Sequence, residues 1–143
     1  MRRTALHLVV FVTSVVALAA CRPSDGPVPI AYDEAACGHC RMLISEPAFS
    51  AQIQTDDGEV LDFDDPGCLL RYRAERKPAE ESSWFHHVRE NRFVRGNAVG
   101  FVRVPHTPMG FGFGAVDADE PGAIPIGEVS AEIERSAARR GAP

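Results

Sequence analysis

The sequence predicts an α+β protein in which two small ββαβ-like modules pack together after an N-terminal signal and lipid anchor. Residues 49–63 hold two short segments of alternating polarity around an Asp-Gly turn, and a capped helical segment follows them. A similar order of strand and helix signals occurs between residues 93 and 140. Residues 4–20 are apolar and uncharged, which separates this N-terminal segment from the folded part.

The N-terminus carries the pattern of an export signal. Arg2 and Arg3 precede the apolar stretch, which is too short and wrongly flanked for a permanent membrane span. It ends in Leu-Ala-Ala-Cys, which resembles a bacterial lipobox, so we expect residues 1–20 to be a lipoprotein signal peptide and Cys21 to carry lipid. An uncleaved anchor or a plain signal peptide are the alternatives. The prediction places the protein on the periplasmic side of a bacterial membrane, the outer one in preference.

Composition argues against a nucleic-acid-binding protein. The chain of 143 residues has a formal net charge of −5, and its signal segment contains two arginines and no acid, so the exported part is more acidic still. Residues 21–31 are rich in proline and small polar residues and are expected to form a flexible tether to the membrane. The remainder is long enough for one modest core or two very small ones.

The first module is expected over residues 32–80. Residues 49–55 and 59–63 form a predicted hairpin around the turn at Asp57 and Gly58. Asp65 can cap a helix whose first position is Pro66, and this helix is expected to end near Lys77, before a proline.

The second module is expected over residues 84–140. Residues 93–104 predict one or two strands around a Gly-Asn turn, and residues 110–117 alternate between small and apolar residues, which predicts another strand. Residues 126–140 predict a helix because apolar residues recur at helical spacing and arginines collect in its last turn.

The stretch Cys-Gly-His-Cys-Arg-Met at residues 37–42 is the most informative part of the chain. Thiolate and thioether are soft donors that favour Cu(I), whereas zinc sites seldom use methionine. The initiator aside, the chain has two methionines, Met42 and Met109, and neither lies within an apolar stripe typical of core packing. Cys37, Cys40, Met42 and Met109 are therefore the predicted Cu(I) ligands.

Other readings of these cysteines remain open. Cys37 and Cys40 can also form a redox-active pair or a plain disulfide. With Cys21 lipidated, three thiols remain, an odd number that leaves at least one unpaired. Cys68 lies at the first turn of the predicted helix and is a weaker candidate ligand, because a small buried residue facing the sheet is equally expected there. His39 and His106 are weaker candidates too, since most single histidines are surface residues.

Four elements in sequence order resemble the NosL family, the lipoproteins encoded beside nitrous oxide reductase. They are the lipobox, the Cys-x-x-Cys-x-Met element, Phe-Asp-Asp-Pro-Gly-Cys-Leu at residues 63–69, and Thr-Pro-Met-Gly-Phe-Gly at residues 107–112. The resemblance covers most of residues 18–116, and Arg41 departs from it because glycine is common at that position.

The resemblance implies a fold similar to that of organomercurial lyase and a periplasmic Cu(I)-binding accessory protein. Such a protein would deliver copper to nitrous oxide reductase or its assembly machinery, with Cys37, Cys40, Met42 and Met109 at the family's ligand positions. No nucleophile, base and orienting group occur together in the sequence, so we predict that the protein is not an enzyme. A thiol–disulfide oxidoreductase using Cys37 and Cys40 is the alternative, and a structural lipoprotein is a third possibility.

Overall fold

The computed structural model describes residues 26–141. The predicted signal peptide, the lipid attachment at Cys21 and the first five residues of the tether, 21–25, lie outside the described residues. The described part is a mixed α+β structure with two antiparallel sheets and two helices, which confirms the predicted fold class. No helix in this part of the chain is long and apolar enough to cross a membrane.

The first sheet has four strands in the order β2-β1-β3-β4. Strands β1 (Ala51–Thr55) and β2 (Val60–Phe63) form the expected antiparallel hairpin, preceded by a short 3₁₀ turn over Pro47–Phe49. Helix α1 (Pro66–Arg76) follows. The Asp65 side chain accepts a hydrogen bond from the backbone N–H of Gly67, and Lys77 ends the helix in a left-handed conformation. Both predicted ends of this helix are confirmed.

The predicted ββαβ order includes a strand after the first helix without assigning residues to it, and the structure places this strand at β3 (Glu80–His86). It pairs antiparallel with both β1 and β4 (Phe93–Arg95), although its first half is polar. The hydroxyl of Ser82 donates to the side chain of Gln54 on β1 at 3.2 Å, and Arg73 of α1 donates to Ser83 at 2.9 Å. Polar partners on neighbouring elements therefore replace the apolar alternation that usually marks a strand.

The second sheet has the order β6-β5-β7, formed by β5 (Val99–Arg103), β6 (Phe113–Asp117) and β7 (Ile124–Pro125). The predicted strand region over residues 93–104 is divided by its Gly-Asn turn, so that β4 joins the first sheet and β5 the second. The strand expected from residue 110 begins only at Phe113. Gly110 and Gly112 have φ values of 70° and 77°, a left-handed conformation that a strand does not contain.

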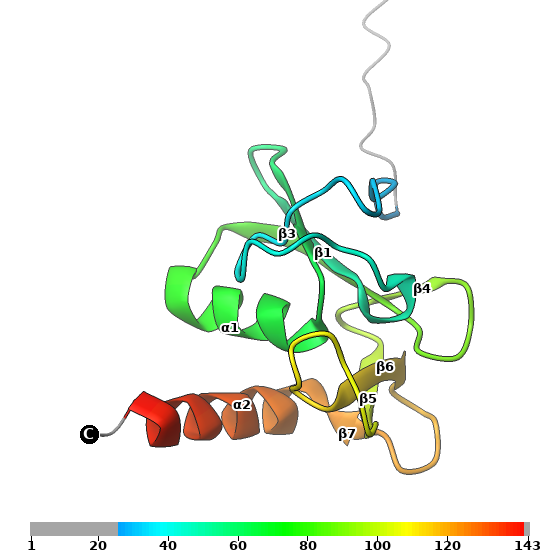
Figure 1. Cartoon of the computed structure of the whole chain (residues 1–143). Coiled ribbons are helices and arrows are strands. Elements are labelled where there is room, and N and C mark those ends of the chain that lie inside the picture. The colour runs from blue at the N-terminus through cyan, green and yellow to red at the C-terminus, as the bar shows by residue number, and fades with distance from the viewer. Residues whose placement is uncertain (1–25, 142–143) are drawn as a thin grey trace, which may run out of the picture.

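One hydrophobic core joins the two sheets. The rings of Phe85 on β3 and Phe101 on β5 meet edge to face with centroids 5.4 Å apart, and both side chains are fully buried. Helix α2 (Ile126–Gly141) adds the buried residues Val129 and Ile133, which confirms its expected apolar face. In Figure 1, α1 lies between the four-stranded sheet and α2, and the two helices pack against each other.

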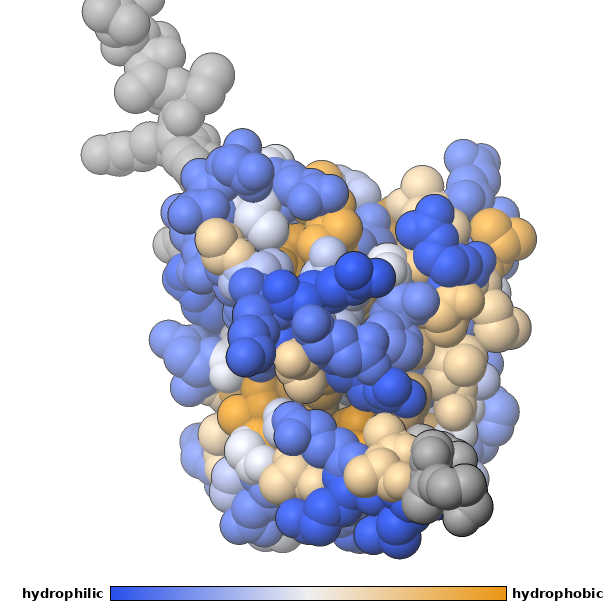
Figure 2. All heavy atoms as spheres, turned by 90° about the vertical axis from the view of Figure 1, so that its left-hand side faces the viewer, coloured by the Kyte–Doolittle hydropathy of each residue, from blue (hydrophilic) through white to orange (hydrophobic). Residues whose placement is uncertain are grey.

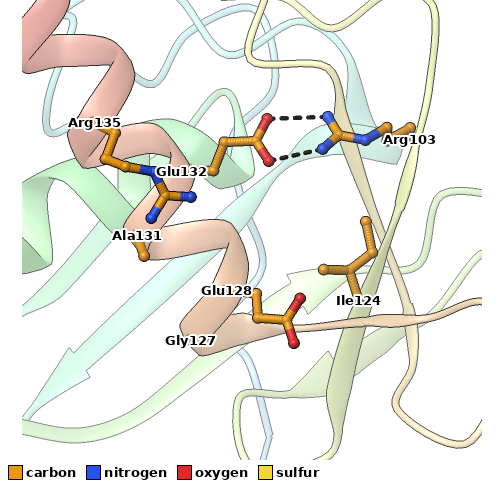
Figure 3. Close-up of a pocket in the computed structure, with 7 residues that line it drawn as sticks. All are labelled: Arg103, Ile124, Gly127, Glu128, Ala131, Glu132 and Arg135. Atoms are coloured by element: carbon orange, nitrogen blue, oxygen red, sulfur yellow. Dashed lines mark hydrogen bonds and ion pairs between the residues drawn. The ribbon is translucent and has the colours of Figure 1, made fainter.

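One face of this arrangement is largely hydrophilic. Figure 2 looks onto the side where both helices end and shows hydrophilic residues over most of it, with hydrophobic areas between them. On another face, Arg103 of β5 and Glu132 of α2 form a two-pronged ion pair across a groove, with N–O distances of 3.1 and 2.7 Å (Figure 3). The residues that line this groove include no cysteine or histidine, so it is separate from the site described below.

The partly buried carboxyl of Asp62 on β2 is expected to make the stability of the protein depend on pH. Burial raises the pKa of this carboxyl, partly offset by a 2.7 Å hydrogen bond from the Gln52 side chain. A raised pKa means that the folded state favours the neutral carboxyl. The stability that this carboxyl contributes is therefore present below its unfolded-state pKa of about 4, and it is lost as the pH rises through the folded-state pKa. We expect Asp62→Asn to increase the free energy of unfolding at pH 7, and the increase to disappear below about pH 3.5. Urea denaturation at both pH values measures the difference, and equal gains at both would contradict it.

Candidate metal centre

Three cysteines from two distant parts of the chain converge in the structure. Cys37 and Cys40 lie in the loop before the first sheet, and Cys68 lies in the first turn of α1. Their sulfur atoms all lie within 4.8 Å of one another, and all three are free thiols. In Figure 1 the loop, drawn in cyan, lies beside α1. This group of thiols could hold a metal ion.

The loop is shaped by backbone hydrogen bonds around Cys37. A bridge between Ala36 and Leu43 closes it, and the N–H of Cys37 donates to the carbonyl of Met42 at 2.8 Å. The N–H of Arg41 donates back to the carbonyl of Cys37 at 3.1 Å, which turns the two cysteines toward the same side. Arg41 adopts a φ of 67°, a conformation that glycine adopts at lower energy.

Two contacts hold this loop and α1 against their neighbours. The N–H of Gly38 donates to the carbonyl of Asp62 at 2.8 Å, which attaches the loop to β2. Gly67, next to Cys68, packs directly under the ring of Phe111. A Cβ atom on Gly67 would lie 2.2 Å from that ring, closer than any real contact. The first turn of α1 is therefore fixed by the segment that contains Met109.

Gly67→Ala is expected to destabilise the fold by about 1–3 kcal/mol, because the ring of Phe111 must move to admit the methyl group. Gly127→Ala in the first turn of α2 is the matched control, since a Cβ there meets nothing within 4 Å. The control is expected to be neutral or stabilising by up to about 1 kcal/mol. Thermal or urea denaturation of the two variants measures this contrast, and similar effects of both substitutions would refute the tight packing at Gly67.

The three thiols differ in their electrostatic surroundings. The pKa of Cys37 is lowered to about 4, because its sulfur accepts hydrogen bonds from the Cys68 thiol and from the backbone N–H groups of Asp64, Cys40 and His39. The pKa of Cys68 is raised because its proton is used in that hydrogen bond and because it is buried, and burial also raises the pKa of Cys40. These contacts favour the thiolate at Cys37 and the protonated thiol at Cys40 and Cys68, and a metal ion that binds all three sulfurs must displace the protons they still carry.

The three thiols also differ in exposure. The residues Cys37 and Cys68 are 0% exposed, whereas Cys40 is partly exposed. Of the three, Cys40 is therefore the residue that an ion or reagent from solvent can approach with the least displacement of the fold.

Both predicted methionine ligands lie at the surface beside this cluster. Met42 is 55% exposed and follows Cys40 in the loop, where its N–H donates to the Cys40 sulfur. Met109 is 37% exposed, and its N–H donates at 3.1 Å to Asp65, the cap of the helix that carries Cys68. Their backbones are thus attached to the two sides of the cysteine cluster, and their ligand role stays a prediction.

The candidate histidines make other contacts. His39 Nε2 lies 3.3 Å from the Glu75 carboxylate on α1, and His106 is mostly exposed and lies 3.5 Å from Glu46. The group of donors within 4.8 Å contains Cys68 and neither of these histidines. Cys68, predicted only as a weaker candidate, is therefore a full member of the thiol cluster. The Pro66 helix start indicated its position in the first turn, but sequence alone did not show what that turn faces.

A second group of possible donors, His87, Asp117 and Glu120, joins the two sheets. His87 is buried, its Nε2 lies 2.8 Å from Glu120, and its Nδ1 accepts the N–H of Arg89. Both carboxylates are ion-paired with arginines: Glu120 with Arg89 and Asp117 with Arg92. Each donor is already used, so this group acts as a polar connection between the sheets.

The chain was compared with protein-family models, with curated proteins and with solved structures, and none of them matches it.

Proposed function

We propose that this protein is a Cu(I) chaperone that holds the ion with Cys37, Cys40 and Cys68 and releases it to an acceptor protein. The observation that carries the proposal is the convergence of three free thiols within 4.8 Å at the edge of the core. Thiolates are soft ligands that select Cu(I) over hard cations. Structural zinc sites usually have four ligands, and the donor group here contains three.

Exposure supports transfer rather than permanent storage. Cys40 is partly exposed, the exposed residue Met42 lies in the same loop, and the exposed residue Met109 lies in a loop that is hydrogen-bonded to Asp65 at the start of α1. An acceptor sulfur can approach at Cys40, form a bond to the ion and replace one ligand at a time. No bond within a substrate is made or broken in this exchange, so the proposed role is not enzymatic.

The acceptor follows from the resemblance to NosL. On that basis we propose delivery to nitrous oxide reductase or its assembly machinery, from a site tethered to the outer membrane through lipid on Cys21. The acidic exported domain suits a basic acceptor surface.

Anaerobic titration of the reduced protein against a Cu(I)-specific chelator tests the proposal. We expect one Cu(I) per chain, and no tight binding after joint replacement of Cys37, Cys40 and Cys68 by serine. Cys21→Ser is the matched control, because it removes the one other cysteine of the chain and should leave binding unchanged. Tight binding that survives the triple substitution would place the site elsewhere, and an equal preference for Zn²⁺ would reject copper specificity.

The lowered pKa of Cys37 favours one alternative, a thiol–disulfide oxidoreductase. An oxidoreductase presents its reactive thiolate to the substrate, whereas Cys37 is 0% exposed and the accessible thiol is Cys40. Catalytic turnover of a dithiol with a small disulfide distinguishes the two functions. The chaperone proposal predicts that the protein reacts with the disulfide at its own thiols only stoichiometrically, without repeated turnovers that outpace the uncatalysed exchange.

A further inference from the structure

The order of access to the three thiols has a chemical consequence. We propose that Cys40 is a modification site for disulfide reagents, and that Cys37 then converts the adduct into a Cys37–Cys40 disulfide that disables the metal centre. The modification depends only on the arrangement of the thiols, and its effect on metal binding rests on the proposed function.

Accessibility selects Cys40 as the site of first attack. Cys40 is a partly exposed residue, while Cys37 and Cys68 are fully buried members of the hydrophobic core. A disulfide reagent must bring its own sulfur into line with the attacking sulfur, which requires open space on that side. Reaction at Cys37 or Cys68 therefore requires local opening of the fold, whereas reaction at Cys40 does not.

Geometry selects Cys37 as the resolving thiol. Cys37 and Cys40 lie three residues apart in a single turn that is closed by the Arg41 to Cys37 hydrogen bond, and their sulfurs lie within 4.8 Å. The Cys37 sulfur accepts hydrogen bonds from surrounding N–H groups, while the Cys68 thiol is directed at Cys37 as a donor. Cys68 also belongs to a helix whose first turn is fixed under Phe111, so it is less free to move toward Cys40.

The two steps balance with one molecule of disulfide as the oxidant. Cys40 first gives up its proton to solvent, and its sulfur then attacks a reagent RSSR, which breaks the S–S bond, forms a Cys40–SR bond and releases RS⁻, which takes up a proton as RSH. The Cys37 thiolate then attacks the Cys40 sulfur, which forms the Cys37–Cys40 bond and releases a second RS⁻. The two cysteines lose two electrons and the reagent gains them.

The product has one remaining thiol in the cluster, Cys68, which is buried. One sulfur cannot replace three, so the oxidised protein should not retain Cu(I). Conversely, an ion bound by Cys40 and Cys37 occupies the sulfur electron pairs that both steps need. Oxidation and metal loading are then mutually exclusive states of one site.

Mapping of the products in the reduced, metal-free full chain tests the proposal. The native protein is first labelled briefly with iodoacetamide, and Cys40 should react at least about tenfold faster than Cys37 or Cys68, whose reaction is limited by local opening. The protein is then treated with oxidised glutathione and digested. We expect a Cys37–Cys40 disulfide with Cys68 still free, and a glutathione adduct that accumulates on Cys40 in Cys37→Ser.

The Cys68→Ser variant should form the same Cys37–Cys40 disulfide. Faster labelling of a buried cysteine, a disulfide that includes Cys68, or absence of any disulfide would overturn the proposal. The labelling order in the unsubstituted protein decides the first step even if a variant does not fold.

A Cu(I) titration of the oxidised and re-reduced samples separates the two proposals. Loss of binding on oxidation and recovery on reduction support both. If the reduced protein binds no Cu(I) while the disulfide forms as described, the chaperone function fails and the modification stands. If Cu(I) binds tightly but the disulfide does not form, the modification fails alone.

Discussion

Replacement of Cys68 by serine is expected to lower the affinity for Cu(I) by at least about 100-fold, since loss of a group that only orients a ligand already costs roughly 10–100-fold. Cys68 is the one thiol of the cluster that comes from α1, so its removal leaves only the two sulfurs of the loop. Serine has nearly the same size, so the packing of the helix turn should change little. Competition with a Cu(I) chelator measures the change, with circular dichroism as the check on folding.

The matched control is Ser83→Ala, a small buried polar residue on β3 that is not part of the donor group. It should leave the Cu(I) affinity unchanged. If the Cu(I) affinity of Cys68→Ser stays within a factor of about three of that of the parent protein, the ion is held by the loop alone. Loss of a true ligand would lower the affinity by more than the roughly tenfold that loss of an orienting group already costs.

Replacement of Asp65 by alanine is expected to destabilise the fold by about 2–4 kcal/mol, the sum of a lost helix cap and of buried donors left without partners. The carboxylate is fully buried and accepts hydrogen bonds from the N–H of Gly67 at 2.8 Å and the N–H of Met109 at 3.1 Å. The hydroxyl of Thr107 donates to it as well. One side chain thus caps α1 and holds the loop over residues 105–112 against the helix.

Asp119→Ala is the control for this experiment, because Asp119 is exposed and should change stability by less than about 0.5 kcal/mol. Asp65→Asn should fall between the two, since its amide keeps one acceptor oxygen. Urea denaturation of all three variants gives the order. Equal stability of Asp65→Ala and the parent protein would mean that the buried donors find other partners.

Elements with local signals could be predicted from the sequence. The β1–β2 hairpin follows from alternation around the Asp-Gly turn, and α1 from Asp65 and Pro66 at its start, because capping and turn formation depend on adjacent residues. Strand β3 could not be predicted in this way. Its polar half is stabilised by Gln54 and Arg73, which are distant in sequence.

The candidate site likewise combines residues that the sequence could identify with one that it could not. Cys37 and Cys40 could be identified from their spacing, whereas the membership of Cys68 depends on how the loop attaches to β2 and how α1 packs, neither of which has a sequence pattern. The opposite error concerns the segment at residues 110–112, where alternation with phenylalanine suggested a strand. Two glycines with positive φ form a loop there, and the ring of Phe111 covers Gly67 instead of facing a sheet.

The bridge between Ala36 and Leu43 bears on how metal binding would change the stability of the protein. It is an isolated pair rather than part of a sheet, and the N–H of Gly38, bonded to the carbonyl of Asp62, attaches the Cys37–Cys40 segment to β2. An ion shared with Cys68 would clamp this loop to the helix, and ligand present at 100 times its Kd would add about 2.7 kcal/mol to the folded state. The metal-bound protein would therefore melt at a higher temperature and resist proteases around residue 40, and release of the ion would remove this added stability.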